Sequence, residues 1–432
     1  MIKKEMISLT KQQKIVAVGS WLGWSLDGYD LVLMLLVIPS ISQLFFPSTD
    51  ATLSLMAIFA TYIITLIMRP FGGAFFGNLG DKYGRKKPMV ITIIGFSLAT
   101  FATGFLPTWQ MMGILAPILL IFLRFVQGFF AGGEWASGTV ITMETVNKPS
   151  RGLLSGFLQS GYNLGFVIAS IVYQIVLSQY PGNSFLDMGW RVMFFTGVIP
   201  GLVATLVRFK MSESATWLEK SREKKLERTP LKKIFATEKR KFFLALIIMT
   251  GLMFSYYTSI GFLPTFLQKF VNLDKPEVAT LMIVATVTSL FGQIFTGFIS
   301  QYIGRRRTMM IVSIAAIIVA IPSIYGLYHA TTIFERILYV IILIMAATTG
   351  FGPIPAFLAE RFQTSIRNSA SGFAYNGGLL VGSWAPLVAV TVLSQVGSMA
   401  PIFLGINLMI GSVILLVGAK LNPETKDVDL TG

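Results

Sequence analysis

The stretch Gly77-Asn78-Leu79-Gly80-Asp81-Lys82-Tyr83-Gly84-Arg85-Lys86-Lys87 interrupts a chain that is otherwise almost continuously apolar. It is short, rich in glycine and strongly basic, and it separates two long hydrophobic runs. Lys and Arg are retained on the inner side of a membrane during insertion, so we expect a cytoplasmic loop here. A weaker copy follows at 297–307, with Gln301 in the position of Asp81. A loop that occurs twice predicts a chain built from two related halves.

The composition is that of a membrane protein. Of the 432 residues, 54% are hydrophobic and 13% are charged, and the mean hydropathy is +0.70. A soluble globule of this length would expose large apolar patches at that composition. The net charge of +15 comes mostly from basic residues between the apolar runs, so nucleic acid is not expected as a partner. The absence of Cys excludes disulfides and thiol catalysis, and no His and Cys cluster is present for a metal.

The apolar runs have the length of membrane-spanning helices. About 20 apolar residues cross a hydrocarbon core of roughly 30 Å. The first run, from about residue 15 to 46, is too long for the apolar core of a signal peptide, so we expect a first span there. Further spans are expected near 52–76, 88–106, 113–143, 152–178, 189–208, 242–268, 278–300, 308–328, 333–357, 369–394 and 400–420. The predicted fold is an all-α polytopic membrane protein with about twelve transmembrane helices.

The distribution of charge predicts the orientation and the division of the chain. Of the 35 Lys and Arg residues, 29 fall in the terminal segments and in alternate connections, and three fall in the opposite connections. We therefore expect both termini in the cytoplasm of a protein in the cell membrane. The one long polar segment divides the chain into an N-terminal bundle (1–208), a linker (209–240) and a C-terminal bundle (241–432). Residues 216–226 of the linker suit either a solvated connection or a surface helix anchored by Trp217 and Leu218.

A second match supports the internal repeat. Arg151 with Ser155-Gly156-Phe157 recurs 216 residues later as Arg367 with Ser371-Gly372-Phe373. The loop pair has a similar offset of 220 residues. Two pseudo-symmetric bundles of six helices, with a substrate site between them near the midplane, are a common solution for a secondary transporter.

Several stretches together resemble the major facilitator superfamily. The segment from Gly77 to Lys86 resembles the family's signature loop between helices 2 and 3, and Arg69-Pro70-Phe71-Gly72-Gly73 resembles the version found in metabolite:proton symporters. Other matching stretches are Arg124-Phe125-Val126-Gln127-Gly128, Gly132-Gly133-Glu134, Ser212-Glu213-Ser214 with Trp217, Glu360-Arg361-Phe362 with Arg367, and Tyr375-Asn376 with Gly378. The resemblance implies a transporter that acts as a monomer in the bilayer on a small solute and protons, without a cofactor.

A gate is expected around the repeated loop. Asp81 can cap the N-terminus of a nearby helix or pair with Arg85, and the glycines allow tight turns and close helix contacts. With Gln301 in place of Asp81, the second copy should form a weaker lock. The gating residues that we predict are Gly77, Asp81, Gly84, Arg85, Arg69, Glu144 and Arg151. The alternative is that the loop only sets the topology of the chain.

Ionisable residues inside the spans are the candidates for proton coupling, because each costs at least about 2.5–3.5 kcal/mol near the bilayer centre. Asp27 and Asp30 are three residues apart, which places them on one face of the first helix. Glu134 is the third candidate. The context of Asp30 resembles that of the helix 1 acid of sugar and phosphate symporters, and Arg124 resembles its helix 4 partner. Helix depth alone does not choose between Asp27 and Asp30, and structural ion pairs are the alternative for all of these residues.

The predicted substrate-binding residues are polar and aromatic positions within the spans. They are Arg124, Gln127, Gln159, Asn163, Tyr256, Gln293, Tyr375 and Asn376, with Tyr162, Tyr257 and Trp384 as further residues that can face a central cavity. Tyr and Trp at such positions serve equally often in packing. The only histidine, His329, is expected in a solvated loop.

These observations predict a proton-coupled importer of a small organic anion, such as a mono- or dicarboxylate. An ATP-driven pump would need a Gly-x-x-x-x-Gly-Lys-Ser/Thr loop, which the sequence lacks, and an enzyme is not expected. A drug antiporter is less expected because helix 5 lacks the Gly-Pro pair that the resemblance implies for such exporters. A uniporter, and a symporter for a sugar, phosphate or zwitterion, remain open.

Overall fold

The structure is a computed structural model that describes residues 9–49, 51–223, 227, 229–385, 388–389 and 399–430. These residues form helices, turns and short connections, and no strand occurs in the described ranges. Within the described ranges, ten helical segments are long and apolar enough to cross a membrane. The other two predicted spans are α4 (Lys86–Thr103), which has 18 residues, and α18–α19, which leads into residues outside the described ranges. The prediction of an all-α polytopic membrane protein is confirmed.

The first half of the chain contributes six packed segments. They are α2 (Lys11–Phe45), α3 (Ala51–Tyr83), α4, α6 (Leu115–Thr145), α7 (Arg151–Gln179) and a broken sixth segment of η2 (Phe185–Gly189), α8 (Trp190–Thr196) and α9 (Val198–Phe209). The short elements α5 (Trp109–Met112) and η1 (Lys148–Ser150) lie in connections. A capping box between Thr10 and Gln13 fixes the start of α2, where free backbone N–H groups would otherwise need partners.

The second half repeats this arrangement. Its segments are α12 (Lys239–Thr258) with α13 (Leu263–Lys269), α14 (Lys275–Ile303), α15 (Arg305–His329), α16 (Ile333–Thr348) with η3 (Thr349–Phe351) and α17 (Ile354–Arg361), α18 (Arg367–Gly377) with α19 (Leu379–Gly382), and α21 (Ala400–Leu421). Between the halves lie α10 (Ala215–Arg222) and α11 (Pro230–Thr237). The boundaries 1–208, 209–240 and 241–432 stay a prediction as limits of separate domains.

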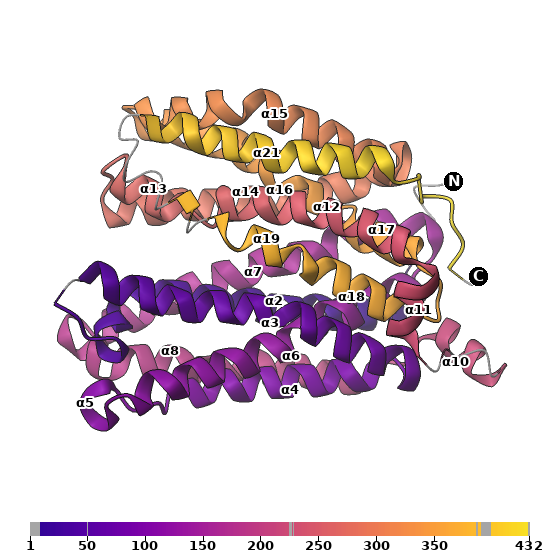
Figure 1. Cartoon of the computed structure of the whole chain (residues 1–432), viewed down its shortest axis with the longest axis horizontal. Helices are drawn as coiled ribbons and strands as arrows, with labels where there is room; N and C mark the ends of the chain where they lie inside the picture. Colours follow the sequence, from indigo (N-terminus) through magenta and orange to yellow (C-terminus); the bar gives the residue numbers. More distant parts are fainter. Residues whose placement is uncertain are drawn as a thin grey trace.

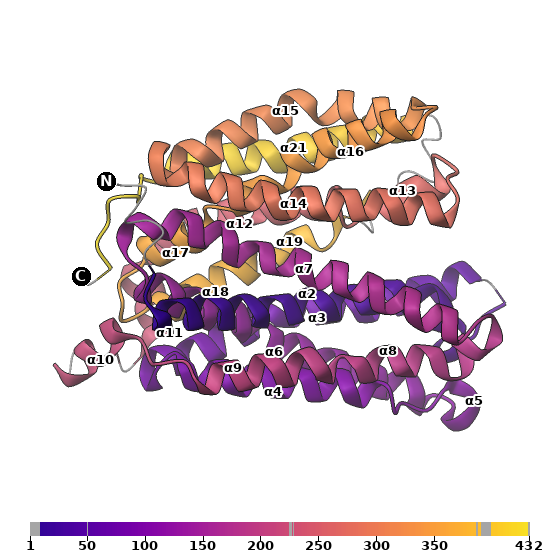
Figure 2. The same cartoon turned by 180° about the vertical axis from the view of Figure 1, so that it is seen from behind.

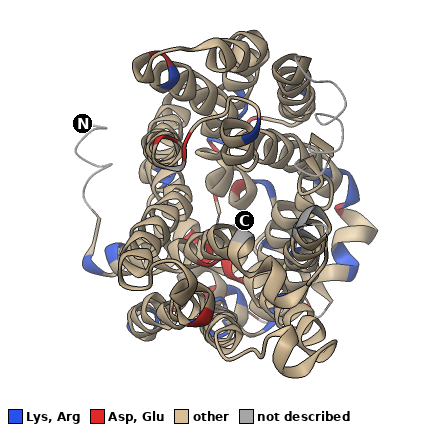
Figure 3. Ribbon diagram, turned by 90° about the vertical axis from the view of Figure 1, so that its left-hand side faces the viewer, with Lys and Arg blue, Asp and Glu red and all other residues tan. Residues whose placement is uncertain are grey.

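The two halves lie side by side with their helices roughly parallel to one long axis (Figures 1 and 2). Leu9 and Leu430 belong to one apolar cluster, so both chain ends lie at the same end of the bundle. We name this the proximal end, and the opposite end, with α5 and α13, the distal end (Figure 1). Figure 3 looks along the helices from the distal end and shows several Asp and Glu segments toward the middle of the bundle.

Two pairs of helices form the main contact between the halves: α3 packs on α18, and α7 packs on α14. Glycines allow the backbones to touch there. A methyl group at Gly156 would lie 2.3 Å from the carbonyl oxygen of Gln293, and one at Gly73 would lie 2.7 Å from that of Gly372. Because real Cβ atoms do not approach so closely, only glycine permits this packing. The halves are therefore in direct backbone contact toward the proximal end.

The expectation of a loop over residues 77–87 is wrong in its extent. Helix α3 continues to Tyr83, and the chain turns only at Gly84, whose φ is 100°. The second copy turns in the same way at Gly304, with φ 103°. The last turns of α3 stay helical although their residues are polar, because the backbone hydrogen bonds of a helix form within the helix and do not require an apolar surrounding. The charged stretch is thus mostly a helix end followed by a one-glycine turn.

The linker contains a short helix, α10, that is fastened to the first half. Trp217 on α10 donates its indole N–H to the carbonyl oxygen of Asp81 at 2.9 Å, so it fastens the linker to α3. Thr216 is buried, whereas Leu218 is partly exposed. Residues 224–226 of the predicted surface helix lie outside the described residues. The indole N–H of Trp217 is thus used inside the protein, and the choice between a solvated connection and a surface helix stays a prediction.

Candidate functional site

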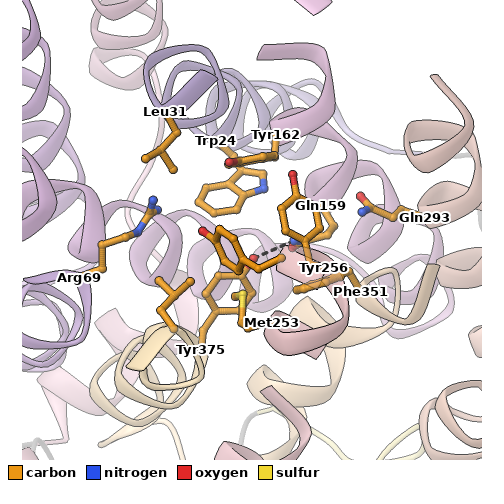
Figure 4. A pocket seen from close by; sticks show the side chains of 12 residues that line it. Trp24, Leu31, Arg69, Gln159, Tyr162, Met253, Tyr256, Gln293, Phe351 and Tyr375 are labelled. Carbon is orange, nitrogen blue, oxygen red and sulfur yellow. Dashed lines mark hydrogen bonds between the residues drawn. The ribbon is translucent and has the colours of Figure 1, made fainter. Parts of the chain in front are cut away.

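A pocket lies between the two halves. Its walls come from helices of both halves and consist of Trp24, Leu31, Arg69, Gln159, Tyr162, Met253, Tyr256, Tyr257, Gln293, Phe351, Tyr375 and Leu379. Figure 4 shows Arg69 on one side, Gln293 on the opposite side and aromatic rings between them. A pocket between two halves of a chain, with largely apolar walls and a few polar groups, is typical of a small-molecule site.

The charged group of the cavity is Arg69, from the middle of α3. Its guanidinium pairs with the Asp27 carboxylate of α2, and both side chains are at most 3% exposed. Arg69 Nε also donates to Asn376 Oδ1 of the second half, at 3.4 Å. The second carboxylate oxygen of Asp27, Oδ1, is buried without a hydrogen-bond partner. The pair therefore retains unused hydrogen-bonding capacity close to the cavity.

The walls of the cavity are mainly aromatic. Trp24 lies 5.4 Å from Tyr162 and 5.8 Å from Tyr375 between ring centroids, and Tyr256 lies 6.0 Å from Phe351. The guanidinium carbon of Arg69 is 5.8 Å from the Trp24 ring centre. The indole N–H of Trp24 has no hydrogen-bond partner, although the side chain is 4% exposed. Such rings suit a compact ligand with apolar or cationic groups.

The polar side of the cavity is held by contacts across the two halves. Gln159 Nε2 of α7 donates to the Tyr375 hydroxyl of α18 at 2.8 Å (Figure 4). Asn163 Nδ2 donates to Gln293 Oε1 of α14 at 3.1 Å. Gln159 and Gln293 therefore belong to both the cavity wall and the contact between the halves.

Asp30 lies on the same helix as Asp27 but in a different environment. Its carboxylate accepts from Thr100 Oγ1 at 2.5 Å and from Gln127 Nε2. Arg124 lies nearby but donates to Thr103 Oγ1 at 3.0 Å and forms no ion pair with Asp30. Both side chains are buried inside the first half and do not line the cavity. The predicted pairing of Asp30 with Arg124 is thus replaced by a cluster in which threonine and glutamine hold the two charges.

Glu134 forms a buried ion pair with Arg208 at the end of α9. Arg208 Nη1 also donates to the carbonyl oxygen of Met89 at 2.6 Å, and Thr92 donates to Glu134 Oε2 at 3.2 Å. A methyl group at Gly23 would lie 1.7 Å from Arg208 Nη2, so this glycine makes room for the pair. The pair ties α6 to α9 and α4 and does not line the cavity.

The predicted gating residues other than Arg69 gather at the proximal end. Asp81 pairs with Arg85 at 2.7 Å and also accepts the backbone N–H groups of Asn368 and Ser369 at the start of α18. Both predicted contacts of Asp81 are therefore present. Glu144 bridges Arg85 and Arg367, at 3.3 and 2.6 Å. Charged side chains thus connect the first half to the N-terminus of a helix of the second half.

The second copy of the loop forms a similar cluster. Gln301 Oε1 accepts from Arg305 Nη2 and from the backbone N–H of Gly152 on α7, both at 2.9 Å. Arg305 also pairs with Glu360 at 3.1 Å. Gln301 therefore occupies the place of Asp81 with a neutral acceptor, as the sequence predicted.

The structure brings half of the predicted substrate-binding residues to the cavity and adds others. Gln159, Tyr256, Gln293 and Tyr375 line it, Asn163 and Asn376 contact lining residues, and Arg124 and Gln127 lie elsewhere. Arg69, predicted as a gating residue, is a lining residue, and Trp24, Leu31, Met253, Phe351 and Leu379 were not predicted. The position of Arg69, a basic residue within a membrane-length apolar run, was the signal that could have placed it at the cavity.

Comparisons with known proteins agree with this architecture. The family model described as Major Facilitator Superfamily matches residues 15–386. The chain is 30% identical to the proline/betaine transporter of Escherichia coli K12, over 98% of this chain and 85% of that protein. It is also 30% identical to a probable 4-methylmuconolactone transporter of Cupriavidus pinatubonensis, over 96% and 92% of the two chains.

Solved structures share the fold. The proton:xylose symporter XylE bound to 6-bromo-6-deoxy-D-glucose superposes with a TM-score of 0.80, at 17% identity over 97% of this chain and 98% of that chain. An inward open conformation of the xylose transporter from E. coli gives 0.68, at 19% identity over 97% and 98%. Together with the family match along most of its length, these findings place this chain in the major facilitator superfamily of membrane transporters.

Proposed function

We propose that the protein imports a small carboxylate-bearing solute together with protons across the cell membrane. The observation that carries this proposal is the buried pair of Arg69 and Asp27 at the wall of the cavity. Arg69 is a ready partner for a carboxylate, because its guanidinium matches carboxylate geometry. Without solute, the guanidinium of Arg69 is paired with the Asp27 carboxylate.

Proton coupling follows from exchange of the two carboxylates. When Asp27 takes up a proton, its attraction to Arg69 falls, and the guanidinium can accept the carboxylate of the solute instead. The net charge of the site is then the same with and without cargo, so the loaded carrier avoids burying an unpaired charge. Asp30, one turn further along α2, is the second acid in this proposal, whereas Glu134 has the structural role of pairing with Arg208.

The closed contacts at the proximal end support transport by alternating access. There α3 meets α18 and α7 meets α14, so the solute would enter from the distal side in this state. The count of Lys and Arg supports a cytoplasmic proximal end with both termini inside. The carrier acts as a monomer, because the cavity is built from the two halves of one chain.

Uptake into vesicles with an imposed pH gradient tests the proposal. Outside-acidic vesicles are expected to accumulate the solute, and unchanged uptake without the gradient would contradict coupling. Asp27→Asn is expected to keep binding but lose stimulation by the gradient. Asp30→Asn is expected to lose accumulation and to retain exchange of labelled for unlabelled solute. Proton-driven accumulation by both variants would show that neither Asp27 nor Asp30 carries the coupled proton.

The aromatic walls favour a second candidate, a zwitterion with a methylated or secondary ammonium group. Trp24, Tyr162, Tyr256, Phe351 and Tyr375 line the cavity beside Arg69, and rings of this kind attract such cations. The relative named proline/betaine transporter also supports this candidate. Inhibition of uptake by proline and glycine betaine is compared with inhibition by carboxylates that carry no ammonium group. Inhibition by the zwitterions alone selects the second candidate.

A further inference from the structure

The segment after α21 folds back over the proximal end of the bundle. Its first part is fastened to the second half: Glu424 accepts the backbone N–H groups of Arg305 and Arg306 at 2.8 and 3.1 Å, and Thr425 donates to Glu360 at 2.9 Å. The first half has the equivalent device after α9. There Glu213 accepts the backbone N–H groups of Arg85 and Lys86 at 2.9 and 3.1 Å.

Beyond Thr425 the tail crosses to the other half (Figure 1). The carbonyl oxygen of Asp427 accepts from Lys148 Nζ, and that of Val428 accepts from Arg151 Nη1 at 3.0 Å. The carbonyl oxygen of Leu430 accepts from Arg367 Nη2 and from Thr364 Oγ1, both at 3.1 Å. Residues 427–430 are thus held by both halves through main-chain carbonyl groups.

Leu430 is the apolar anchor of this segment. It is 2% exposed and belongs to a cluster with Ala17, Met143, Val146 and Leu154 of the first half and Ala356 and Ala359 of the second. A leucine near the end of a polar tail would remain in water unless a pocket received it. Burial of such a side chain is favourable by an amount that corresponds to at least about a tenfold change in an equilibrium.

We propose that residues 427–430 form a strap that holds the proximal end closed and is released each time that end opens. The tail is bound to the second half through Glu424 and Thr425, so any separation of the halves pulls Leu430 out of its cluster or breaks the contacts with Lys148 and Arg151. The strap therefore adds to the charged clusters at Asp81 and Gln301 and favours the distally open state. It does not depend on the identity of the solute.

The test uses the full chain, which has no Cys of its own. Ser137→Cys serves as the reporter, because Ser137 is 0% exposed and accepts a hydrogen bond across the halves from Asn368 at 3.3 Å. A membrane-impermeant maleimide is added to the proximal side. Leu430→Ser is expected to raise the labelling rate roughly tenfold, in line with the loss of one buried leucine. Leu430→Met keeps an apolar anchor and is expected to label like the parent.

Equal labelling of the Leu430→Ser and parent proteins would overturn the strap. A second measurement covers the case in which that variant does not fold. In Leu154→Cys combined with Leu430→Cys, oxidation should join the tail to the first half, stop uptake, and allow recovery with a reductant. Full uptake by the cross-linked protein would also overturn the proposal.

Discussion

Glu134→Gln offers a sharp test of the structural role given to the Glu134–Arg208 pair. The change keeps the shape of the side chain and removes its charge. Arg208 is 0% exposed, so the change leaves its charge buried without the Glu134 carboxylate, although neutral acceptors such as the carbonyl oxygen of Met89 remain. Removal of one partner of a buried pair costs about 3–5 kcal/mol. The equilibrium between native and unfolded protein should therefore shift by roughly 10²-fold to 10⁴-fold.

The double variant Glu134→Met with Arg208→Met separates this role from proton transport. It removes both charges, and such replacements of buried pairs are often neutral or stabilising, so most of the lost stability should return. The assay is the fraction of protein that stays monodisperse in detergent after heating. Gly23→Ala is a matched probe, because its methyl group would displace the pair without altering a charge. It should destabilise the parent protein more than the double variant.

Two results would refute the reasoning. A Glu134→Gln protein as stable as the parent would mean that the pair contributes nothing to the fold. A double variant that is stable and binds solute, yet no longer responds to a pH gradient, would show that Glu134 carries the proton. In that case the proposed role of Asp27 and Asp30 would fail.

Further predictions concern the contact between the halves. Gly156→Ala places a methyl group 2.3 Å from the carbonyl oxygen of Gln293, so closure of the proximal end should fail and uptake should fall at least about tenfold. Gly138→Ala is the control: its methyl group would lie 3.4 Å from its nearest neighbour, so this variant should transport normally in the same assay. Asp81→Asn weakens charge-assisted hydrogen bonds to Arg85 and to the start of α18, worth about 1.5–3 kcal/mol each. Labelling of Ser137→Cys from the proximal side should rise more than tenfold, and an unchanged rate would show that Asp81 does not hold the gate.

The sequence allowed the helices and the repeated clusters to be predicted, because membrane length, charge and glycine spacing are local properties. It identified Asp27, Asp30 and Arg124 as candidates for the same reason. It left open which of the two acids meets an arginine. Which acid meets which arginine depends on helix tilt and on neighbours from distant parts of the chain, so depth along each helix was not enough.

Two other differences have the same origin. Arg208 stands at the end of an apolar run and was not among the predicted site residues, yet α9 carries it into the core beside Glu134. The polar residues 77–83 read as a loop, although polar residues also sustain a helix end that is packed against α10 and α18. The composition of a segment therefore indicates whether it lies in the apolar layer or in water more reliably than it indicates whether its backbone is helical.

The backbone contacts at Gly156 and Gly73 have a consequence for the speed of transport. Glycine has no side-chain rotamers to fix, so forming these contacts costs no side-chain entropy, whereas a long side chain such as Arg costs about 1.5–2 kcal/mol to immobilise. At these two positions the surfaces can separate and meet again without ordering of a side chain. We therefore expect the ionic clusters beside them, which must dissociate, to contribute more to the barrier for opening than the glycine contacts do.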